Sequence, residues 1–415
     1  MIFNSSKYNN HWSEKKLSDL GSFRRGKSRH RPRNDPSLFE NGIYPLVQTG
    51  EVKQADLYIN SHNSCYNELG LSQSELWPEN TLCITIAANI AETALLGYPM
   101  CFPDSVVGFN AEQNESSELF MHYVFTYIRK AIQNSASGSI QDNINIDYLT
   151  GLKFKVPLKK DQDKIVAVLS MLDNKIDLNN RINAELEKMA KTLYDYWFVQ
   201  FDFPDANGKP YKTSGGKMAY NATLKREIPA GWDVKTLSQI ANITMGQSPA
   251  GESYNDEGNG TLFFQGSTDF GWLFPAPRQY TTSPARMAKK GDILLSVRAP
   301  VGDMNIANAD CCIGRGLAAL NSKSGSDGFL FYVMKYFKQV FERRNSEGTT
   351  FGSITKNDLH SLSVAYPQSD LLKKYDDIVS DYNKMIFVRS LENQDLTKLR
   401  DWLLPLLMNG QVTVR

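Results

Sequence analysis

Hydrophobic and polar positions follow one order twice along the chain. In each copy, short apolar runs bounded by Gly, Pro, Asn and Ser predict β-strands, and an amphipathic segment then predicts a helix. A loop rich in Gly and Ser or Thr follows, then a last strand ending at Pro157 or Pro367, and then a long helix. The predicted strands are Tyr44–Val47, Thr81–Ala87 and Val106–Phe109 in the first copy, and Leu262–Gln265, Asp292–Val297 and Leu317–Leu320 in the second. The predicted shorter helices are Glu118–Gln133 and Phe329–Arg343.

The two copies also match at individual residues. Trp12 and Trp232 begin the similar segments WSEKKLS and WDVKTLS, at an offset of 220 residues. A Gly-x-Ser follows each of them, at residues 26–28 and 246–248. Near the end of each copy the offset is 210 residues, as at Pro157 and Pro367. These matches indicate one large duplicated unit rather than a solenoid of short repeats.

The long helix of the first copy is predicted over residues 161–199, and its apolar residues recur at heptad spacing. Its two seams are Ile165, Leu172, Asn179, Leu186 and Leu193, and Val168, Lys175, Ile182, Met189 and Tyr196. Those of the second copy are Tyr375, Tyr382, Arg389, Leu396 and Leu403, and Ile378, Met385, Glu392, Leu399 and Leu406. Apolar ends and a polar centre in matched register favour a coiled-coil pair. Two unrelated amphipathic helices, each on its own domain, are the alternative.

An antiparallel pair of these helices would bring their polar centres together. Asn179 would lie near Glu392, and Ile182 near Arg389. A helix of about 38 residues spans roughly 57 Å, more than one turn of DNA at about 34 Å. We therefore predict an α+β protein with two globular α/β domains related by a pseudo-twofold axis and separated by two long antiparallel helices. The predicted boundaries are 1–157 and 232–367 for the domains, 158–203 and 368–409 for the helices, and 204–231 for a connector.

Composition limits the class of protein without identifying it. The chain has 415 residues, 41% of them hydrophobic, which suffices for packed cores in two or three domains. The net charge of +1 means that any DNA contact must come from local patches. The five cysteines have neither zinc-ligand nor disulfide-framework spacing, and no apolar run has transmembrane length. A cytoplasmic protein without bound metal is expected.

Basic residues are concentrated in one segment of the first copy. Six of the ten residues from 24 to 33 are basic and none is acidic, namely Arg24, Arg25, Lys27, Arg29, Arg31 and Arg33. Such a segment, predicted here as a loop, can neutralise several DNA phosphates, although a merely solvated basic loop is the alternative. The corresponding loop of the second copy lacks arginines. Its candidate cations lie elsewhere, at Arg298, Arg315, Arg343 and Arg344.

Side chains able to read base edges accompany these cations in both copies. Asn and Gln suit adenine, arginine suits guanine, and Ser or Thr can pair with either. The candidates are Gln48, Thr49, Ser137, Ser139 and Gln141 in the first copy, and Gln247, Ser248, Gln265, Ser267, Thr268, Thr349, Thr350 and Ser353 in the second. Different side chains on one duplicated scaffold predict two different DNA half-sites.

Catalytic motifs are missing from the sequence. It contains no Gly-x-Gly-x-x-Gly, no Walker A lysine loop, no Asn/Asp-Pro-Pro-aromatic motif and no His-Glu-x-x-His. Pro103-Asp104 resembles the start of a nuclease motif, but no Asp/Glu-x-Lys follows at useful spacing. We therefore expect no catalytic residue in this chain. An enzyme with its own methyltransferase or nuclease, and a coiled-coil adaptor that binds only proteins, are the alternatives.

The centre of the chain resembles a known family. Residues 193–203 (LYDYWFVQFDF) close the first long helix, and SGGKM at 214–218 and REIPAGW at 226–232 follow. This order resembles the central region of the specificity subunit of Type I restriction–modification systems, and the resemblance covers essentially the whole chain. It implies that each variable domain is a target recognition domain for one half of a split, asymmetric DNA sequence. It also implies that the helices set the spacing between the halves.

The same resemblance implies partners and cofactors. Two methyltransferase subunits would bind the chain and supply S-adenosylmethionine, and ATP-dependent restriction subunits, with ATP and Mg²⁺, could join them. The long helices and the connector would form the docking surface, with a contribution from Tyr194, Tyr196, Trp197 and Phe198. Core packing is the alternative role for each of these aromatic residues. Base contacts vary freely within the family, so the DNA-binding candidates rest on residue chemistry alone.

Overall fold

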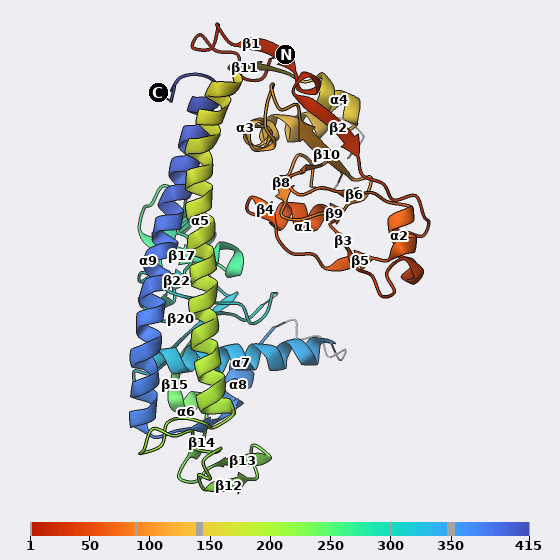
Figure 1. Ribbon diagram of the computed structural model, residues 1–415. Helices are drawn as coiled ribbons and strands as arrows, with labels where there is room; N and C mark the ends of the chain where they lie inside the picture. The colour runs from red at the N-terminus through yellow and green to blue at the C-terminus, as the bar shows by residue number, and fades with distance from the viewer. Residues whose placement is uncertain (1, 88, 138–143, 299, 347–352, 415) are drawn as a thin grey trace. The chain divides into compact units, whose positions relative to one another are not determined.

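The duplication seen in the sequence corresponds to two compact units. The computed structural model describes residues 2–87, 89–137, 144–298, 300–346 and 353–414 (Figure 1). The first unit combines residues 1–178 with 393–415, and the second comprises residues 179–392. Each long helix therefore contributes one half to each unit.

The strands of the first unit form a larger and a smaller sheet, with the orders β2-β10-β7-β8-β4 and β5-β3-β9-β6. Strands β7 and β8 are buried along their whole length, and apart from Thr85 and Thr93 their sequences are apolar rather than alternating. The strands of the larger sheet are β2 (Gly21–Arg25), β4 (Tyr58–Ile59), β7 (Leu82–Thr85), β8 (Thr93–Leu96) and β10 (Val106–Ala111). Those of the smaller sheet are β3 (Tyr44–Leu46), β5 (Ser64–Tyr66), β6 (Leu76–Trp77) and β9 (Met100–Cys101).

The second unit repeats this plan, with its strands divided differently between the two sheets. Its sheets have the orders β15-β23-β20-β21 and β16-β18-β17-β22-β19. The first of these contains β15 (Ala241–Met245), β20 (Ile293–Ser296), β21 (Met304–Ile306) and β23 (Leu317–Ser322). The second contains β16 (Tyr254–Asn255), β17 (Thr261–Phe264), β18 (Gln279–Thr281), β19 (Met287–Ala288) and β22 (Cys311–Ile313). Thus β15, β23, β20 and β21 correspond to β2, β10, β7 and β8, and the strands predicted from the sequence are confirmed.

The tryptophan-containing segments that open each copy pair with the strand that closes it. Strand β1 (Ser13–Lys16) pairs antiparallel with β11 (Lys153–Val156), and β14 (Asp233–Thr236) pairs in the same way with β24 (Ser363–Tyr366). A helical turn follows each opening strand, and its first residue, Leu17 or Leu237, is fully buried. The repeated sequence motif therefore closes the two ends of each unit against each other.

A helix of similar length packs against the sheets of each unit. Helix α3 (Glu118–Ser137) lies against β7, β8 and β10, and α7 (Asp327–Ser346) lies against β23. Phe120, Val124 and Ile128 on α3, and Leu330 and Val333 on α7, are buried in the two cores. The remaining short helices are α1 (Thr49–Gln54), α2 (Glu68–Ser72), α4 (Ile146–Gly151), α6 (Leu237–Ile240) and α8 (Lys356–Ser361).

The long helices are α5 (Lys159–Tyr194), extended by a π-helical turn (Asp195–Val199), and α9 (Ser369–Met408). They run antiparallel in each unit. In the first unit Asp173 binds Arg400 (2.9 Å), and in the second the hydroxyl of Tyr375 donates to the carbonyl oxygen of Ala190 (3.1 Å). The predicted meeting of Asn179 and Glu392 is confirmed, since the amide nitrogen of Asn179 donates to Glu392 Oε2 (2.8 Å).

The second of the two predicted heptad seams is wrong at several positions, although Glu392 meets Asn179 as predicted and Val168 and Ile182 pack partly against the cores. Met189, Ile378 and Met385 belong to that seam but are 50%, 37% and 38% exposed. The buried positions lie one residue further along, at Leu169 and Ala190 in α5 and at Val379 and Ile386 in α9. The physical reason is that each helix also packs on α3 or α7, which rotates the buried face away from a simple two-helix seam.

The connector and the end of α5 form an aromatic cluster in the core of the second unit. Tyr194, Trp197 and Phe198 are 4%, 7% and 5% exposed, and the ring of Phe198 lies 4.8 Å from that of Phe329. The prediction that these three residues contact a partner is therefore corrected, because their rings pack inside the unit. Tyr196 is 38% exposed, and its partner contact stays a prediction.

The connector itself is a folded segment. Its hairpin pairs β12 (Met218–Asn221) with β13 (Arg226–Pro229). Phe203 stacks on Tyr211 and on Trp232, with ring centroids 4.6 and 5.3 Å apart.

Among the described residues, no helix combines the length and the hydrophobicity that a membrane-spanning segment needs.

Candidate nucleic-acid interface

A glycine turn occupies the same place in both units, directly after the edge strand β2 or β15. The amide of Gly26 donates to the carbonyl oxygen of Val106 (2.9 Å), and the amide of Gly246 donates to that of Leu317 (2.9 Å). A Cβ atom on either glycine would lie within 2.3 Å of a carbonyl oxygen in the neighbouring loop. Glycine is required at both positions because the two backbones approach so closely.

The neighbouring loop leads into β10 or β23 and carries opposite charges in the two units. Val106 and Leu317, which accept the glycine hydrogen bonds, are equivalent positions. Asp104 lies two residues before Val106 in the first unit, and Arg315 lies two residues before Leu317 in the second. Arg315 is exposed, and the side chain of Asp104 is 36% exposed. One loop thus presents an acid in one unit and a base in the other.

A glutamine forms the third part of this surface in each unit. Gln48 follows β3 and Gln265 follows β17, and each of these strands pairs in parallel with the strand before the charged loop. Gln48 is exposed at the start of α1, where its backbone amide donates to Glu51 Oε2 (3.1 Å). Gln265 is also exposed, and its amide nitrogen donates to the hydroxyl of Ser248 (2.9 Å).

In the second unit these segments bring several of the predicted residues together. The backbone amide of Arg315 donates to Ser248 Oγ (3.3 Å), and the amide of Gly316 donates to the carbonyl oxygen of Gln265 (3.2 Å). Arg298 lies in the adjoining loop and forms a β-bridge with Ser353. The residues on these neighbouring loops are Gln247, Ser248, Gln265, Arg298, Arg315 and Ser353, and Ser267 and Thr268 follow in the next turn. Together they form a polar surface with two exposed arginines.

In the first unit, Glu75 neutralises part of the basic segment. It pairs with Arg24 (2.8 Å) and Lys27 (2.6 Å), and the hydrogen bond from Lys27 is the main reason why the pKa of Glu75 lies below its ordinary value. Arg24 also lies over the ring of Trp77, 4.4 Å from its centroid. Arg24 and Arg25 belong to β2, so the prediction that the whole segment is a loop is wrong for these two residues.

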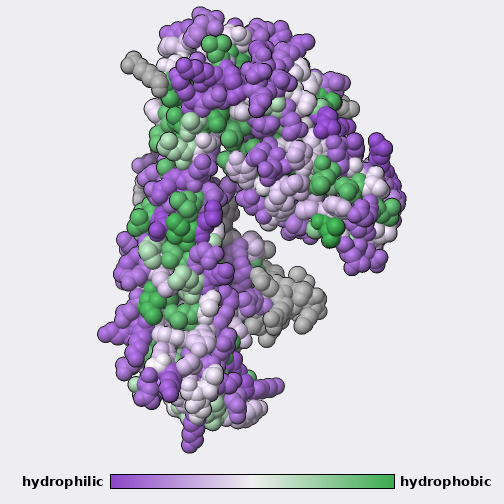
Figure 2. All heavy atoms as spheres, in the orientation of Figure 1, coloured by the Kyte–Doolittle hydropathy of each residue, from purple (hydrophilic) through white to green (hydrophobic). Residues whose placement is uncertain are grey.

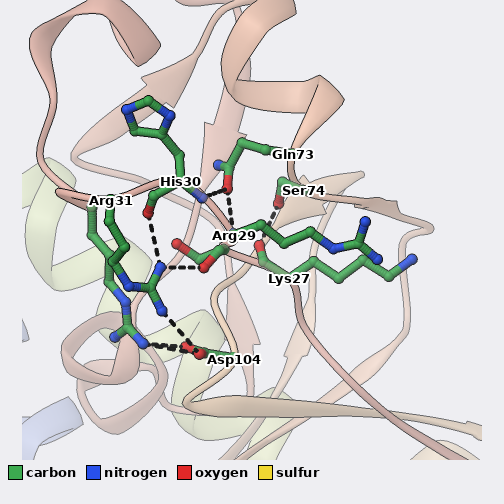
Figure 3. A network of polar contacts seen from close by, with 9 residues as sticks. Lys27, Arg29, His30, Arg31, Gln73, Ser74 and Asp104 are labelled. Atoms are coloured by element: carbon green, nitrogen blue, oxygen red, sulfur yellow. Dashed lines mark hydrogen bonds and ion pairs between the residues drawn. The ribbon is translucent and has the colours of Figure 1, made fainter.

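Asp104 holds two arginines of the basic loop, which we define as residues 26–34 (Figure 3). Arg33 Nη2 binds both carboxylate oxygens of Asp104, at 2.8 and 2.9 Å, and Arg31 Nη2 lies 3.9 Å from Oδ2. The other terminal nitrogen of Arg31 donates to the carbonyl oxygens of Ser28 (2.6 Å) and His30 (2.8 Å). Arg31 is thereby folded back onto its own loop.

Two residues between α2 and β6 fix the backbone of the basic loop (Figure 3). Gln73 Oε1 accepts from the amides of Arg29 (2.6 Å) and His30 (3.1 Å), and the hydroxyl of Ser74 donates to the carbonyl oxygen of Lys27 (3.0 Å). At the end of the loop, hydrogen bonds from His30 and Ser37 lower the pKa of Asp35 to about 2. Gln73 and Ser74 therefore hold the backbone of the loop without any contribution from Asp104.

The positive charge of this segment is smaller than its sequence suggests. Glu75 and Asp104 pair with four of the six basic residues. Within the described part of the chain, no acid lies within ion-pair distance of Arg25 or Arg29, and both are exposed. The sequence alone did not point to Gln73, Ser74, Glu75 or Asp104 as part of this site. Each is more than 40 positions from its partner, so no local pattern links them.

Some predicted residues lie beyond what the structure describes. Ser137 ends α3, and Arg343 and Arg344 belong to α7, but their side chains are outside the described residues. Ser139, Gln141, Thr349 and Thr350 are outside them altogether. Thr49 is the first residue of α1 and is partly exposed. A role in DNA binding stays a prediction for all of these residues.

The chain thus belongs to the class of duplicated α+β proteins, with exposed polar loops at matching strand ends of two similar units. The sequence profile described as "Type I restriction modification DNA specificity domain" matches residues 9–188 and again 229–396. The chain therefore belongs to the family of Type I restriction–modification specificity subunits, and it contains two target recognition domains.

Individual relatives agree with this assignment. The chain is 34% identical over 296 residues to a proposed type I restriction enzyme MjaX specificity subunit of Methanocaldococcus jannaschii. The matched residues make up 70% of this chain and 65% of that protein. It is 23% identical to the MjaIX specificity subunit of the same organism, over 97% of this chain and 94% of the relative. A crystal structure of the S subunit of a Type I system from M. genitalium has the same fold, with a TM-score of 0.61 at 17% identity over 98% of this chain and 99% of that one.

Proposed function

We propose that this chain reads a bipartite, asymmetric DNA sequence, with one unit for each half-site, and presents it to methyltransferase subunits. The observation that carries the proposal is the repeated polar surface around the glycine turn. The same three segments form it in both units, but the side chains differ, with Lys27 replaced by Gln247 and Asp104 by Arg315. One scaffold with two sets of donors and acceptors suits two different half-sites.

The long helices are the proposed docking surface for two methyltransferase subunits. Hydrophobic side chains gather along these helices on the face shown in Figure 2. In the first unit Met171 is 68% exposed and Trp402 62%, and in the second Met189 is 50% exposed and Val388 63%. Exposed apolar rows of this kind mark protein interfaces. Restriction subunits would join the same complex and cleave DNA that lacks the methyl mark.

In this proposal the chain supplies recognition, and its partners supply the chemistry. S-adenosylmethionine, ATP and Mg²⁺ would be bound by the methyltransferase and restriction subunits. Three side chains capable of nucleophilic or acid–base chemistry, Cys101, Cys311 and His122, are buried in the cores. Burial raises the pKa of the Cys101 and Cys311 thiols to about 11 and about 12, and it lowers the pKa of His122 to about 3.

Mapping methylated adenines tests the proposal directly. Cells that lack other adenine methyltransferases would express the methyltransferase subunit with or without this chain, and their genomes would be sequenced for N6-methyladenine. We expect methylation only with the chain present, at two short motifs separated by a fixed gap. Methylation that does not require the chain, or that follows no bipartite motif, would favour an adaptor that binds only proteins.

A further inference from the structure

The loop before β10 carries a carboxylate where the equivalent loop of the second unit carries a guanidinium. Asp104 and Arg315 occupy equivalent positions beside the glycine turn, and Asp104 pairs with Arg31 and Arg33. The arginine side chains are 57% and 50% exposed, so the contact lies at the surface and is open to a competing anion. Arg33 contacts both carboxylate oxygens of Asp104 through one nitrogen, Nη2, so the pair does not use the two-nitrogen fork with which arginine binds phosphate most strongly.

A phosphate group of DNA would compete with Asp104 for the same donors. Exposed ion pairs are weak and exchange readily, so a DNA backbone at the loop could displace the carboxylate. The backbone of the loop would stay in place during this exchange, because Gln73 and Ser74 bind it independently of Asp104. The exchange would therefore change only the partner of the arginines.

We propose that Asp104 is a specificity-determining residue that occupies Arg31 and Arg33 in the free protein and suppresses their binding to phosphates of unrelated DNA. The suppression is overcome only where the first unit also gains base contacts, at its own half-site. The inference rests on the proposed function, since it concerns how the same surface discriminates between DNA sequences. In the second unit the equivalent residue, Arg315, adds a positive charge instead of neutralising one. No carboxylate of the described residues lies within ion-pair distance of Arg315.

The test compares Asp104→Asn with a charge-matched control in the complex with methyltransferase subunits. Glu79→Gln removes one negative charge from the same unit, and Glu79 is exposed with no ion pair among the described residues. The probes are two 40-base-pair duplexes, one with the mapped methylation site and one without it. Binding is measured between about 50 and 200 mM salt, because each phosphate contact contributes about −0.9 to the slope of log K against log salt.

For Asp104→Asn we expect about threefold to tenfold tighter binding to the unrelated duplex, and a slope steeper by about 1 to 2 as two arginines become available. Affinity for the site should change less, so the discrimination ratio falls. Glu79→Gln should leave the slope unchanged. Arg33→Gln should weaken binding to unrelated DNA more in the Asp104→Asn background than in the wild type.

A wild-type slope for Asp104→Asn, or the same effect from Glu79→Gln, would overturn the proposal. Weaker binding of unrelated DNA by Asp104→Asn would also overturn it, because Asp104 would then be orienting the arginines toward phosphate. These outcomes are distinct from failure of the proposed function. That failure would show in the wild-type complex, which would bind both duplexes equally.

Discussion

Arg315 is the side chain of the second unit best placed to read DNA. It is exposed beside Gln265 and Ser248, on the loop whose backbone the glycine turn holds. We expect Arg315→Gln to weaken binding of the methylation site by about 1 to 3 kcal/mol, the range for one bidentate base contact, and to relax the preference at one position of the second half-site. Fluorescence anisotropy with a set of single-base variants of the site measures both effects.

Arg286→Gln is the matched control for this change. Arg286 is an exposed arginine of the same unit that precedes β19 and is not one of the predicted DNA-binding residues. The control should alter affinity only slightly and equally for all sequences. If Arg315→Gln behaves in the same way, Arg315 contacts phosphate at most and is not a base-reading residue.

Asp376 makes the stability of the second unit depend on pH. Burial, with a smaller contribution from Asp327, raises its pKa to about 6, although the backbone amide of Phe329 donates to it (3.0 Å). The folded state therefore binds more protons than the unfolded state between about pH 4 and pH 6, and stability falls as pH rises through this range.

Asp376→Asn should remove this dependence. At pH 7 we expect the variant to be more stable by about 1 to 2 kcal/mol, and at pH 4 to match the wild type. Urea unfolding at both pH values, with Asp377→Asn at a neighbouring exposed position as control, measures the difference. A wild-type dependence in Asp376→Asn would show that another group titrates.

For single residues, the sequence predicted which side chains could contact DNA, but it did not predict which acidic and basic side chains pair with each other. The amide and basic side chains around Gly246, such as Gln265 and Arg315, were identified by residue type. The ion pair between Arg33 and Asp104 was not predicted, because 71 positions separate the two residues and only the fold brings them together.

Polar residues of α5 and α9 contact each other across the pair of long helices. In the first unit Arg400 binds Asp173, which is 9% exposed and also accepts from the hydroxyl of Tyr123 (2.6 Å). Arg400→Met would leave this carboxylate buried without its cation. We expect a loss of about 2 kcal/mol, below the 3 to 5 kcal/mol of a fully buried pair because the Arg400 side chain is 29% exposed.

Amide hydrogen exchange over α3 and α5 measures this loss. Lys398→Met is the control, because Lys398 is 76% exposed and its ion pair in the described part of the chain is with Asp395, which is 81% exposed. Its effect should stay below about 0.5 kcal/mol. Equal protection in both variants would mean that the Arg400 pair contributes little to the packing of the helices.

Helix length is the property expected to set the gap between half-sites. Seven residues inserted into both α5 and α9, between Asn180 and Arg181 and between Leu391 and Glu392, add about 10 Å to each helix. The preferred gap should lengthen by about three base pairs. Insertion into one helix alone should instead destabilise the pair. An unchanged gap in the doubly extended protein would refute the role of the helices as a ruler.

At the element scale, the sequence predicted helices and strands well but the helical faces only in part. Both long helices end within a few residues of their predicted limits, since apolar periodicity and Pro157 and Pro367 mark them. The second seam was displaced by one residue because a heptad assumes a single neighbouring helix. Here Leu169 and Val379 also face the cores that contain α3 and α7.

For the whole molecule, the duplication has a functional consequence. Both units keep the closing strand pair, the glycine turn and the parallel pairing of β3 with β9 or β17 with β22. They differ in the side chains that these elements present. Internal sequence similarity made the duplicated fold predictable, whereas the folded hairpin of the connector carries no repeat and was not predicted.

In the proposed function, each unit reads its own half of the target. The most direct measurement exchanges residues 1–157 for the corresponding domain of another specificity subunit and maps N6-methyladenine in cells that also express the methyltransferase subunit. We expect one half of the motif to change, while the other half and the gap stay the same. A change in both halves, or an unchanged motif, would contradict it.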